Sequence, residues 1–287
     1  GAGMDIFTAI RTGYEAFTKA GRRVADYVLE HPQKAIYLSI TELSDACRVG
    51  DASVFRFCKD LGYRGYQDFK LHLAQALAAS SQEDAAVQLT GAVGFQDSLE
   101  DMLQKVLSSS VAALNETFRY TRPDDIREAT RLLIEARHIV FFGVGGSMVT
   151  AQEAMSRFLR ITPKVRMVGD LHLQLMSAAL MTPEDAAVVF SYSGATKDTL
   201  AVARRAKEAG ARVIAVTRFE RSPLSDLSDL LLRCGANEGP LQGGSIAVKM
   251  SQLYLLDVLY LEYFRQTLGC SIKNKERTAA AGTEHML

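Results

Sequence analysis

The sequence has no excess of charge of either sign, because 33 Lys and Arg residues balance 33 Asp and Glu residues. A neutral chain lacks the long-range attraction that coats nucleic acid or acidic membranes, although a local basic face is compatible with it. A long apolar run is also missing. The most apolar late segment, residues 253–264, contains Asp257 and Glu262 and is too short to span a bilayer. These absences favour a soluble protein.

Cysteine is scarce, and the four cysteines form no C-x-x-C pair. In a chain of 287 residues this pattern indicates reduced thiols, and ligand spacing typical of a metal site is absent. No secretory signal opens the chain, and Gly1–Gly3 ahead of Met4 are left out of the interpretation. We therefore expect a cytoplasmic protein of two ordinary domains that carries no metal or other cofactor.

The chain changes character along its length. Residues 4–79 contain apolar positions at helical spacing and little that resembles a strand, whereas small and polar residues from 80 to 97 indicate a linker. From 98 to 268, short apolar runs alternate with helical segments, as in a parallel sheet with helices on both faces. The expected fold is an all-α domain joined to an α/β domain. A polar tail, 269–287, is expected to lack regular structure.

Two helical segments, 41–48 and 52–60, are separated by a tight turn in the layout of a helix-turn-helix. One face of the second segment is polar and cationic, as contacts with base edges and phosphates require. Arg64 and Lys70 follow as candidates for further phosphate contacts. The alternative is a helical packing module whose cations are merely solvated. The candidate DNA-contacting residues of the second segment are Ser53, Phe55, Arg56 and Lys59.

The run SITELSDACRVGDASVFRFCKDLGYRGYQDFKLHL resembles the N-terminal domain of RpiR-type bacterial transcriptional regulators. Many positions match the family pattern in order, among them Glu42, Arg56, Phe57 and Gly62. Gly50 departs from it, since the family usually has Ser at the start of the recognition helix, and glycine is a weaker N-cap by roughly a few tenths of a kcal/mol. The resemblance implies binding of operator DNA by a homodimer or homotetramer.

Two turns rich in glycine and serine, FFGVGGSM and SYSGAT, each follow an expected strand. A dinucleotide fingerprint is incomplete in the first, because its third glycine would fall at Met148. Hydroxyls and backbone N–H groups at a helix start suit a phosphate, and both turns would lie beyond the carboxyl ends of their strands. The alternative is an ordinary Ser or Thr cap at each junction. The candidate residues are Gly145, Ser147, Ser191, Ser193, Gly194 and Thr196.

This pair of turns resembles the sugar isomerase (SIS) domain, a phosphosugar-binding fold, over about residues 98–264. The resemblance implies that the serines of both turns and Thr196 bind the phosphate of a sugar. Glu238 lies where such domains often place a polar residue that faces the sugar. The candidates for a subunit interface are the long helix expected up to Phe118, the linker, and the terminal helix expected over 244–266. The alternative for the Leu and Tyr stripe of the terminal helix is simple core packing.

An isomerase of the SIS type would need a general base beside C2 of its substrate, for which Glu238, His172 and Lys249 are the candidates. SYSGAT lacks the G-x-S-x-G order of a serine nucleophile. We therefore expect no catalytic residue. The function expected is a transcriptional regulator that responds to a phosphorylated sugar and controls genes of carbohydrate catabolism. An isomerase and a plain phosphosugar-binding scaffold are the alternatives, and the sugar stays open.

Overall fold

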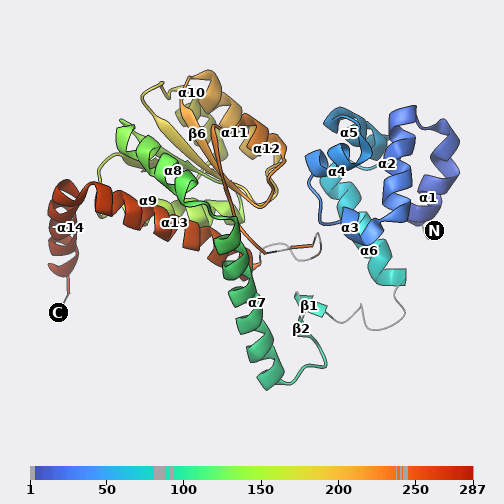
Figure 1. The fold of residues 1–287 in the computed structure, drawn as a ribbon, viewed down its shortest axis with the longest axis horizontal. Helices are drawn as coiled ribbons and strands as arrows, with labels where there is room; N and C mark the ends of the chain where they lie inside the picture. Colours follow the sequence, from blue (N-terminus) through green and yellow to red (C-terminus); the bar gives the residue numbers. More distant parts are fainter. Residues whose placement is uncertain are drawn as a thin grey trace. The chain divides into compact units, whose positions relative to one another are not determined.

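The chain folds into two compact units (Figure 1). Unit 1 comprises Gly1–Val111 and Asn237–Ser245, and unit 2 comprises Ala112–Ala236 and Ile246–Leu287. The structure is a computed structural model that describes residues 4–80, 88–90, 93–236, 238–239, 241 and 245–286. Much of the expected linker, residues 81–87, 91 and 92, therefore lies outside the described residues, as do 237, 240 and 242–244.

Unit 1 begins with a group of short helices, as the sequence predicts. These helices are α1 (Ile6–Gly13), α2 (Lys19–Glu30), α3 (Pro32–Ala35), α4 (Ile40–Cys47), α5 (Asp51–Asp60) and α6 (Tyr66–Ser80), with a 3-10 turn at Tyr14–Ala16. The core contains packed aromatic rings. The Phe57 ring centroid lies 5.0 Å from that of Phe17 in a tilted arrangement and 5.7 Å from that of Phe69 in an edge-to-face arrangement. Ser39 and Glu42 form a capping box that fixes the start of α4.

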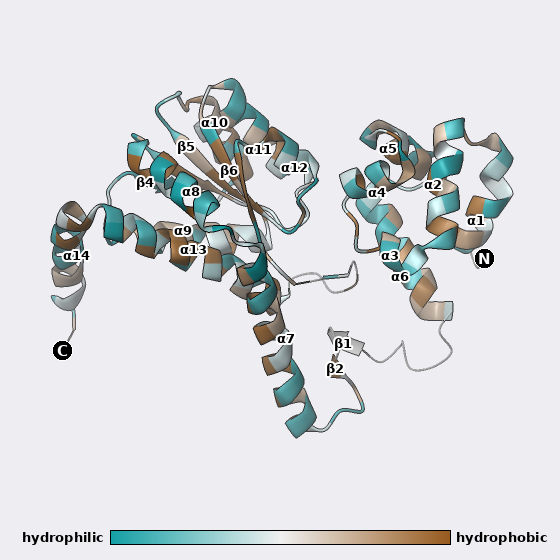
Figure 2. Ribbon diagram, viewed as in Figure 1, coloured by the Kyte–Doolittle hydropathy of each residue, from teal (hydrophilic) through white to brown (hydrophobic). Residues whose placement is uncertain are grey.

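Two features follow these helices along the chain. The strands β1 (Gln88–Thr90) and β2 (Val93–Gly94) pair antiparallel. The helix α7 (Leu99–Tyr120) then runs without interruption from unit 1 into unit 2. Apolar residues lie along much of α7 (Figure 2), and several of them are exposed.

Unit 2 is built on a five-stranded sheet in which every pair of neighbouring strands is parallel. The strands are β3 (Ile139–Phe142), β4 (Val165–Met167), β5 (Ala186–Phe190), β6 (Arg212–Thr217) and β7 (Leu230–Arg233). The helices are α8 (Pro123–Glu135), α9 (Gly146–Leu159), α10 (Leu171–Ala179), α11 (Lys197–Glu208), α12 (Pro223–Leu227), α13 (Ile246–Gln266) and α14 (Leu268–Thr283). The expected α/β domain is confirmed.

Alternate residues of each strand enter different hydrophobic cores, because successive side chains point to opposite faces of a sheet. Phe141 and Val188 pack with α8, α9 and α13 on one face. Phe142 and Val189 pack with α10, α11 and α12 on the other. Helices cover both faces (Figure 1), which is why the neighbouring strands β3 and β5 are apolar and buried at every position rather than alternating.

The strand order, β4-β3-β5-β6-β7, sets the position of the two serine-rich turns. The chain leaves β3 to form β4 on one side and then crosses to form β5 on the other side. Phe142 pairs with Val189, so β3 and β5 end at the same edge of the sheet. Such a switch point between neighbouring parallel strands is where open α/β sheets bind ligands.

The C-terminal segment differs from its sequence-based expectation. Residues 268–283 form the helix α14, so the prediction that the polar tail lacks regular structure is wrong. Asn274 Nδ2 donates to Ile161 O at 2.8 Å, and Thr278 Oγ1 donates to Arg160 O at 2.9 Å. Polar contacts of this kind anchor a helix without an apolar stripe. None of the described helices combines the length and hydropathy that a bilayer crossing requires.

Candidate functional site

The helices α4 and α5 of unit 1 are joined by a short turn, and one carboxylate on α5 accepts hydrogen bonds from α4. Arg48, in the turn, has a left-handed backbone with φ of 57°. Asp51, the first residue of α5, accepts hydrogen bonds from Thr41 Oγ1 at 2.8 Å and from Ser44 Oγ at 2.6 Å. Both hydroxyl-bearing residues are buried. The sequence analysis did not identify this contact, which fixes α5 against α4.

The sidedness of α5 agrees with the sequence. Val54, Phe57 and Cys58 are buried in the unit 1 core. The opposite face carries exposed Arg56 and Lys59, with the Phe55 ring 48% exposed. Ser53 is partly exposed one turn earlier. This face therefore offers a hydroxyl, an aromatic ring and two cations to a partner.

The two cations expected beyond α5 have different environments. The Arg64 side chain is 88% exposed and lies 3.6 Å from the Asp68 carboxylate, so it remains accessible to a phosphate. Lys70 is 6% exposed, and its Nζ donates to Leu38 O at 3.2 Å. Burial lowers the Lys70 pKa to about 8. The prediction that Lys70 contacts DNA is wrong, because its side chain supports the core instead.

The SYSGAT turn after β5 is held by its own hydroxyls. Ser191 Oγ is buried and accepts from Gly194 N at 3.1 Å, while Ser193 Oγ lies 3.3 Å from Thr196 Oγ1. Gly194 has φ of 62°, and a Cβ atom there would lie 2.3 Å from Ser222 Oγ. Glycine is thus required by both backbone conformation and space. Ser193 and Thr196 remain near the surface, where a ligand can reach them.

The GVGGS turn after β3 is equally tight. A Cβ atom on Gly143 would lie 2.3 Å from Ser147 O, so the backbone folds closely on itself. Gly145, with φ of 57°, is the N-cap of α9, and Ser147 lies in the first turn of that helix. Positive φ at Gly145 reverses the chain directly into the helix.

Both turns lead into helices that lack a side-chain cap. The N-cap of α9 is Gly145, which has no side chain, and the N-cap of α11 is Thr196, whose side chain makes no capping hydrogen bond. By contrast, Asp170 caps α10 and Ser222 caps α12 in the same unit. Backbone N–H groups at a helix start and the helix dipole attract anions. Together with the switch point, this geometry offers two uncapped helix starts at one edge of the sheet, which is the kind of position where open α/β sheets bind ligands.

Two residues that the sequence analysis left out of the binding site touch the GVGGS turn. Lys249, on α13, donates through Nζ to Gly146 O and so brings a positive charge to the start of α9. Gln174, on α10, is buried and donates through Nε2 to Gly143 O at 2.9 Å. Lys249 lies 103 residues from Gly146 along the chain. No local sequence pattern therefore indicated that these two side chains contact the turn.

The other candidates for sugar contact are less constrained. His172 is exposed in the first turn of α10, whose residue Gln174 reaches the GVGGS turn. Glu238 Oε1 accepts from Ser245 N at 2.7 Å. Both Glu238 and Ser245 belong to the segment of unit 1 that interrupts unit 2, so the sugar contact of Glu238 stays a prediction.

Comparison with known proteins assigns both units. A model of the rpiR-family helix-turn-helix domain matches residues 4–80, and a model of the SIS domain matches residues 132–262.

Three relatives cover most of the chain. An uncharacterized HTH-type transcriptional regulator of Haemophilus influenzae is 32% identical over 96% of this chain and 95% of its own. The HTH-type transcriptional regulator HexR of Pseudomonas aeruginosa is 35% identical over 89% of this chain and 87% of its own. The structure of the Vibrio vulnificus NanR protein complexed with ManNAc-6P matches with a TM-score of 0.87 and 29% identity, covering 98% of this chain and 99% of that chain. The chain therefore belongs to the RpiR family of HTH-type transcriptional regulators, with an N-terminal helix-turn-helix and a C-terminal SIS domain.

Proposed function

We propose that this regulator binds operator DNA through α5 and that a phosphorylated sugar, bound in unit 2, modulates that binding. The genes controlled are those of carbohydrate catabolism, and the protein acts in the cytoplasm, where the chromosome lies. The observation that carries the proposal is the pair of serine-rich turns at the β3–β5 switch point, each leading into a helix without a side-chain cap.

The geometry supports a phosphate monoester as the anchoring group. Ser147, Ser193 and Thr196 supply hydroxyl donors, and Lys249 supplies a cation at the start of α9. A phosphate accepts several such hydrogen bonds at once, and bonds to a charged acceptor are the stronger ones. The NanR neighbour holds ManNAc-6P, which makes N-acetylated hexosamine 6-phosphates one class to test beside hexose phosphates and sugar acids.

The effector test uses the full chain. Thermal unfolding is measured with and without inorganic phosphate, glucose 6-phosphate, 6-phosphogluconate and N-acetylmannosamine 6-phosphate. A ligand at 100 times its Kd stabilises the folded state by about 2.7 kcal/mol, which raises the midpoint measurably. A mobility shift on the DNA that flanks the protein's own gene then tests operator binding. No sequence-specific, salt-sensitive shift, or no compound that alters it, would contradict the proposal.

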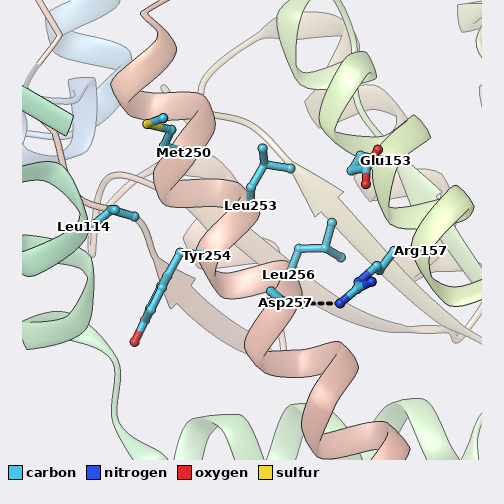
Figure 3. A pocket seen from close by; sticks show the side chains of 8 residues that line it. All are labelled: Leu114, Glu153, Arg157, Met250, Leu253, Tyr254, Leu256 and Asp257. Atoms are coloured by element: carbon cyan, nitrogen blue, oxygen red, sulfur yellow. Dashed lines mark hydrogen bonds and ion pairs between the residues drawn. The ribbon is translucent and has the colours of Figure 1, made fainter. Parts of the chain in front are cut away.

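A second copy of the chain is proposed as the protein partner. Four apolar residues at four-residue spacing, Leu99, Leu103, Leu107 and Val111, are exposed along α7. Leu114, further along α7, lines a cavity of about 510 Å³ in unit 2 together with Met250, Leu253 and Tyr254 of α13 (Figure 3). A helix-turn-helix reads two half-sites by pairing with a symmetric copy. We propose that this apolar face of α7 is covered in the resulting homodimer or homotetramer.

Light scattering after size exclusion tests that partner. Leu107→Asp should shift the assembly towards monomer, because a charge would be buried in an apolar interface. Ser108→Asp adds the same charge at the neighbouring exposed position and should leave the assembly unchanged. A wild-type monomer at micromolar concentration, or equal effects of both substitutions, would contradict the proposed interface.

We propose that unit 2 binds without catalysis. The amine of Lys249 donates to Gly146 O, and the Glu238 carboxylate accepts from Ser245 N, so each group has a role in positioning the backbone that requires no catalysis. Proton exchange at C2 of the same sugar phosphates, followed by NMR in deuterated water, tests this assignment. Exchange that is lost in Glu238→Gln would favour an isomerase instead.

A further inference from the structure

The second half of α7 is hydrogen-bonded to the segment that follows β7. The backbone N–H of Gly235 donates to Thr117 Oγ1 at 2.7 Å, and that hydroxyl donates to Ala113 O at 2.7 Å. A Cβ atom on Gly235 would lie 2.6 Å from Ala113 O and 2.8 Å from Thr117 N. Only glycine fits at this position, so the segment lies with its backbone directly against the helix.

Ala236, the next residue, has a left-handed backbone with φ of 74°. This conformation costs free energy for any residue other than glycine and persists where neighbours hold it. Both backbone polar groups of Ala236 are held. Its N–H donates to Glu116 Oε2 at 3.2 Å, and its carbonyl accepts from Tyr192 Oη at 3.1 Å. A strained residue thus lies between α7 and the SYSGAT turn.

Glu116 is the centre of the contacts on the α7 side. Its Oε1 accepts from Tyr120 Oη at 2.7 Å and from Arg218 Nη2 at 3.0 Å. Burial raises the Glu116 pKa, but the Tyr120 hydrogen bond and the Arg218 charge outweigh it, so the pKa is lowered. The side chain is therefore an ionised carboxylate at neutral pH, and its two oxygens bind three donors in all.

Tyr192 is fixed at both ends. Its carbonyl accepts from Arg218 N at 3.1 Å and from Thr217 Oγ1 at 3.0 Å, at the end of β6. Its hydroxyl reaches Ala236, as described above. Tyr192 also stands between Ser191 and Ser193 in the proposed phosphate turn. A change in the backbone of that turn must therefore move or stabilise the tyrosine.

These contacts lie close in sequence to two of the three places where the chain passes from one unit to the other. The first passage lies inside α7, between Val111 and Ala112, and the second follows Ala236 directly. Glu116 lies on α7 just beyond the first passage and is bonded to Ala236 at the second. Tyr192 joins the proposed phosphate turn to the same residue.

We propose that the Tyr192–Ala236–Glu116 contacts transmit occupancy of the phosphate site to α7, and through it to the DNA-binding unit. This inference rests on the proposed function. Phosphate bound at Ser193 and Thr196 stabilises the turn with Tyr192 bonded to Ala236, and this keeps Ala236 in its strained conformation against Glu116. The empty site permits a second arrangement in which Ala236 relaxes. A ligand that binds the two arrangements unequally shifts their populations.

Tyr192→Phe is the primary test, in the full chain. The measured quantity is a coupling ratio, the Kd for the DNA flanking the gene with saturating N-acetylmannosamine 6-phosphate or glucose 6-phosphate divided by the Kd without it. Removing one hydroxyl should bring this ratio about fivefold closer to 1, whether the sugar phosphate weakens or strengthens DNA binding, as expected for one net hydrogen bond. DNA affinity without the sugar phosphate should change less than about twofold, because Tyr192 lies outside the α5 face.

A second variant and a double mutant show whether the two contacts act together. Glu116→Gln weakens the acceptor for Ala236 N and should bring the coupling ratio closer to 1, as Tyr192→Phe does. The double variant should lose no more of the coupling than either single variant loses, because both contacts hold the same residue, Ala236. By linkage, the same loss must appear in the affinity for the sugar phosphate measured with and without DNA.

Tyr260→Phe is the matched control. Tyr260 is buried in the same unit, and its hydroxyl has no hydrogen-bond partner among the described residues. Its coupling ratio should equal that of wild type, and circular dichroism should show all variants folded. If sugar phosphate changes the DNA affinity of wild type and of Tyr192→Phe by the same factor, the inference is overturned while the proposed function stands. If wild type shows no coupling with any sugar phosphate tested, both are overturned.

Discussion

The two units present their binding groups in different ways. In unit 1, consecutive turns of α5 expose Ser53, Arg56 and Lys59 while burying the residues between them. In unit 2, the candidate groups come from two turns that are distant in sequence and leave the same edge of the sheet because β3 and β5 are neighbours. The residues that share one face of a helix are therefore determined by a short run of sequence. A site at the edge of a sheet depends instead on the order of the strands.

Each site also relies on a buried contact behind it. Asp51 joins α5 to α4 through two hydroxyls in unit 1. In unit 2, Ser222 is buried against Gly194 and leaves no room for a side chain there. The exposed groups are the proposed binding residues, and the buried groups set their positions. Four substitutions test whether the two sites are independent in this way.

Gly194→Ala should have the largest effect. The new Cβ atom would lie 2.3 Å from Ser222 Oγ at a φ of 62°, so overpacking and backbone strain add. We expect the free energy of unfolding of unit 2 to fall by about 3 kcal/mol, with loss of the sugar-phosphate response. Calorimetry of the full chain measures it. Gly282→Ala, at an exposed helical position with open space, should not destabilise the protein.

Lys70→Met tests a pH dependence confined to unit 1. The folded pKa of Lys70, about 8, lies below its ordinary value of 10.5, so the unfolded chain binds more protons between these pH values. The contribution of Lys70 to the free energy of unfolding therefore rises by on the order of 3 kcal/mol as the pH increases from 8 to 10.5. The unit 1 stability of wild type minus that of the variant should increase over this window. A constant difference would mean that Lys70 is not buried as a charge.

Arg56→Ala should separate the two sites. Loss of a guanidinium from the exposed face of α5 should weaken specific DNA binding about tenfold or more. The thermal shift caused by a sugar phosphate should stay unchanged, because Arg56 belongs to the other unit. Arg204→Ala, on the exposed surface of α11, is the matched loss of charge and should leave DNA binding intact. If Arg56→Ala and Arg204→Ala weaken DNA binding equally, the exposed face of α5 is not the DNA interface.

Ser193→Ala should give the smallest and most selective effect. Removing one hydroxyl donor should weaken sugar-phosphate binding about fivefold to tenfold, as for a hydrogen bond to a charged group. DNA affinity in the absence of sugar phosphate should not change. Ser156→Ala, on the exposed side of α9, serves as the control. If both serine variants retain full affinity by calorimetric titration, the SYSGAT turn is not the phosphate site.

Local patterns predicted the elements well. The buried positions Val54, Phe57 and Cys58 follow from helical spacing, and each strand of the sheet follows from a short apolar run. The same reasoning failed for α14, because polar composition resembles an irregular tail. Its anchoring bonds to Arg160 and Ile161 connect segments that are far apart in sequence.

Single residues were harder to assign where burial decides their role. Lys70 resembles a DNA-contacting cation in sequence, yet its chain lies in the core with Leu38 O as acceptor. Lys249 and Gln174 gain their positions only because α13 and α10 pack beside the GVGGS turn. A linear pattern does not distinguish a solvated lysine from a buried one, since both occur on helices.

The sequence by itself determined the two-domain plan, the sidedness of α5 and the identity of both serine-rich turns, because each is encoded within about twenty consecutive residues. Only the tertiary structure decided that β3 lies between β4 and β5, and therefore that the two turns leave the sheet side by side. It also placed Ala236 between Tyr192 and Glu116. Contacts of this kind depend on which segments pack together, and packing is a property of the whole chain.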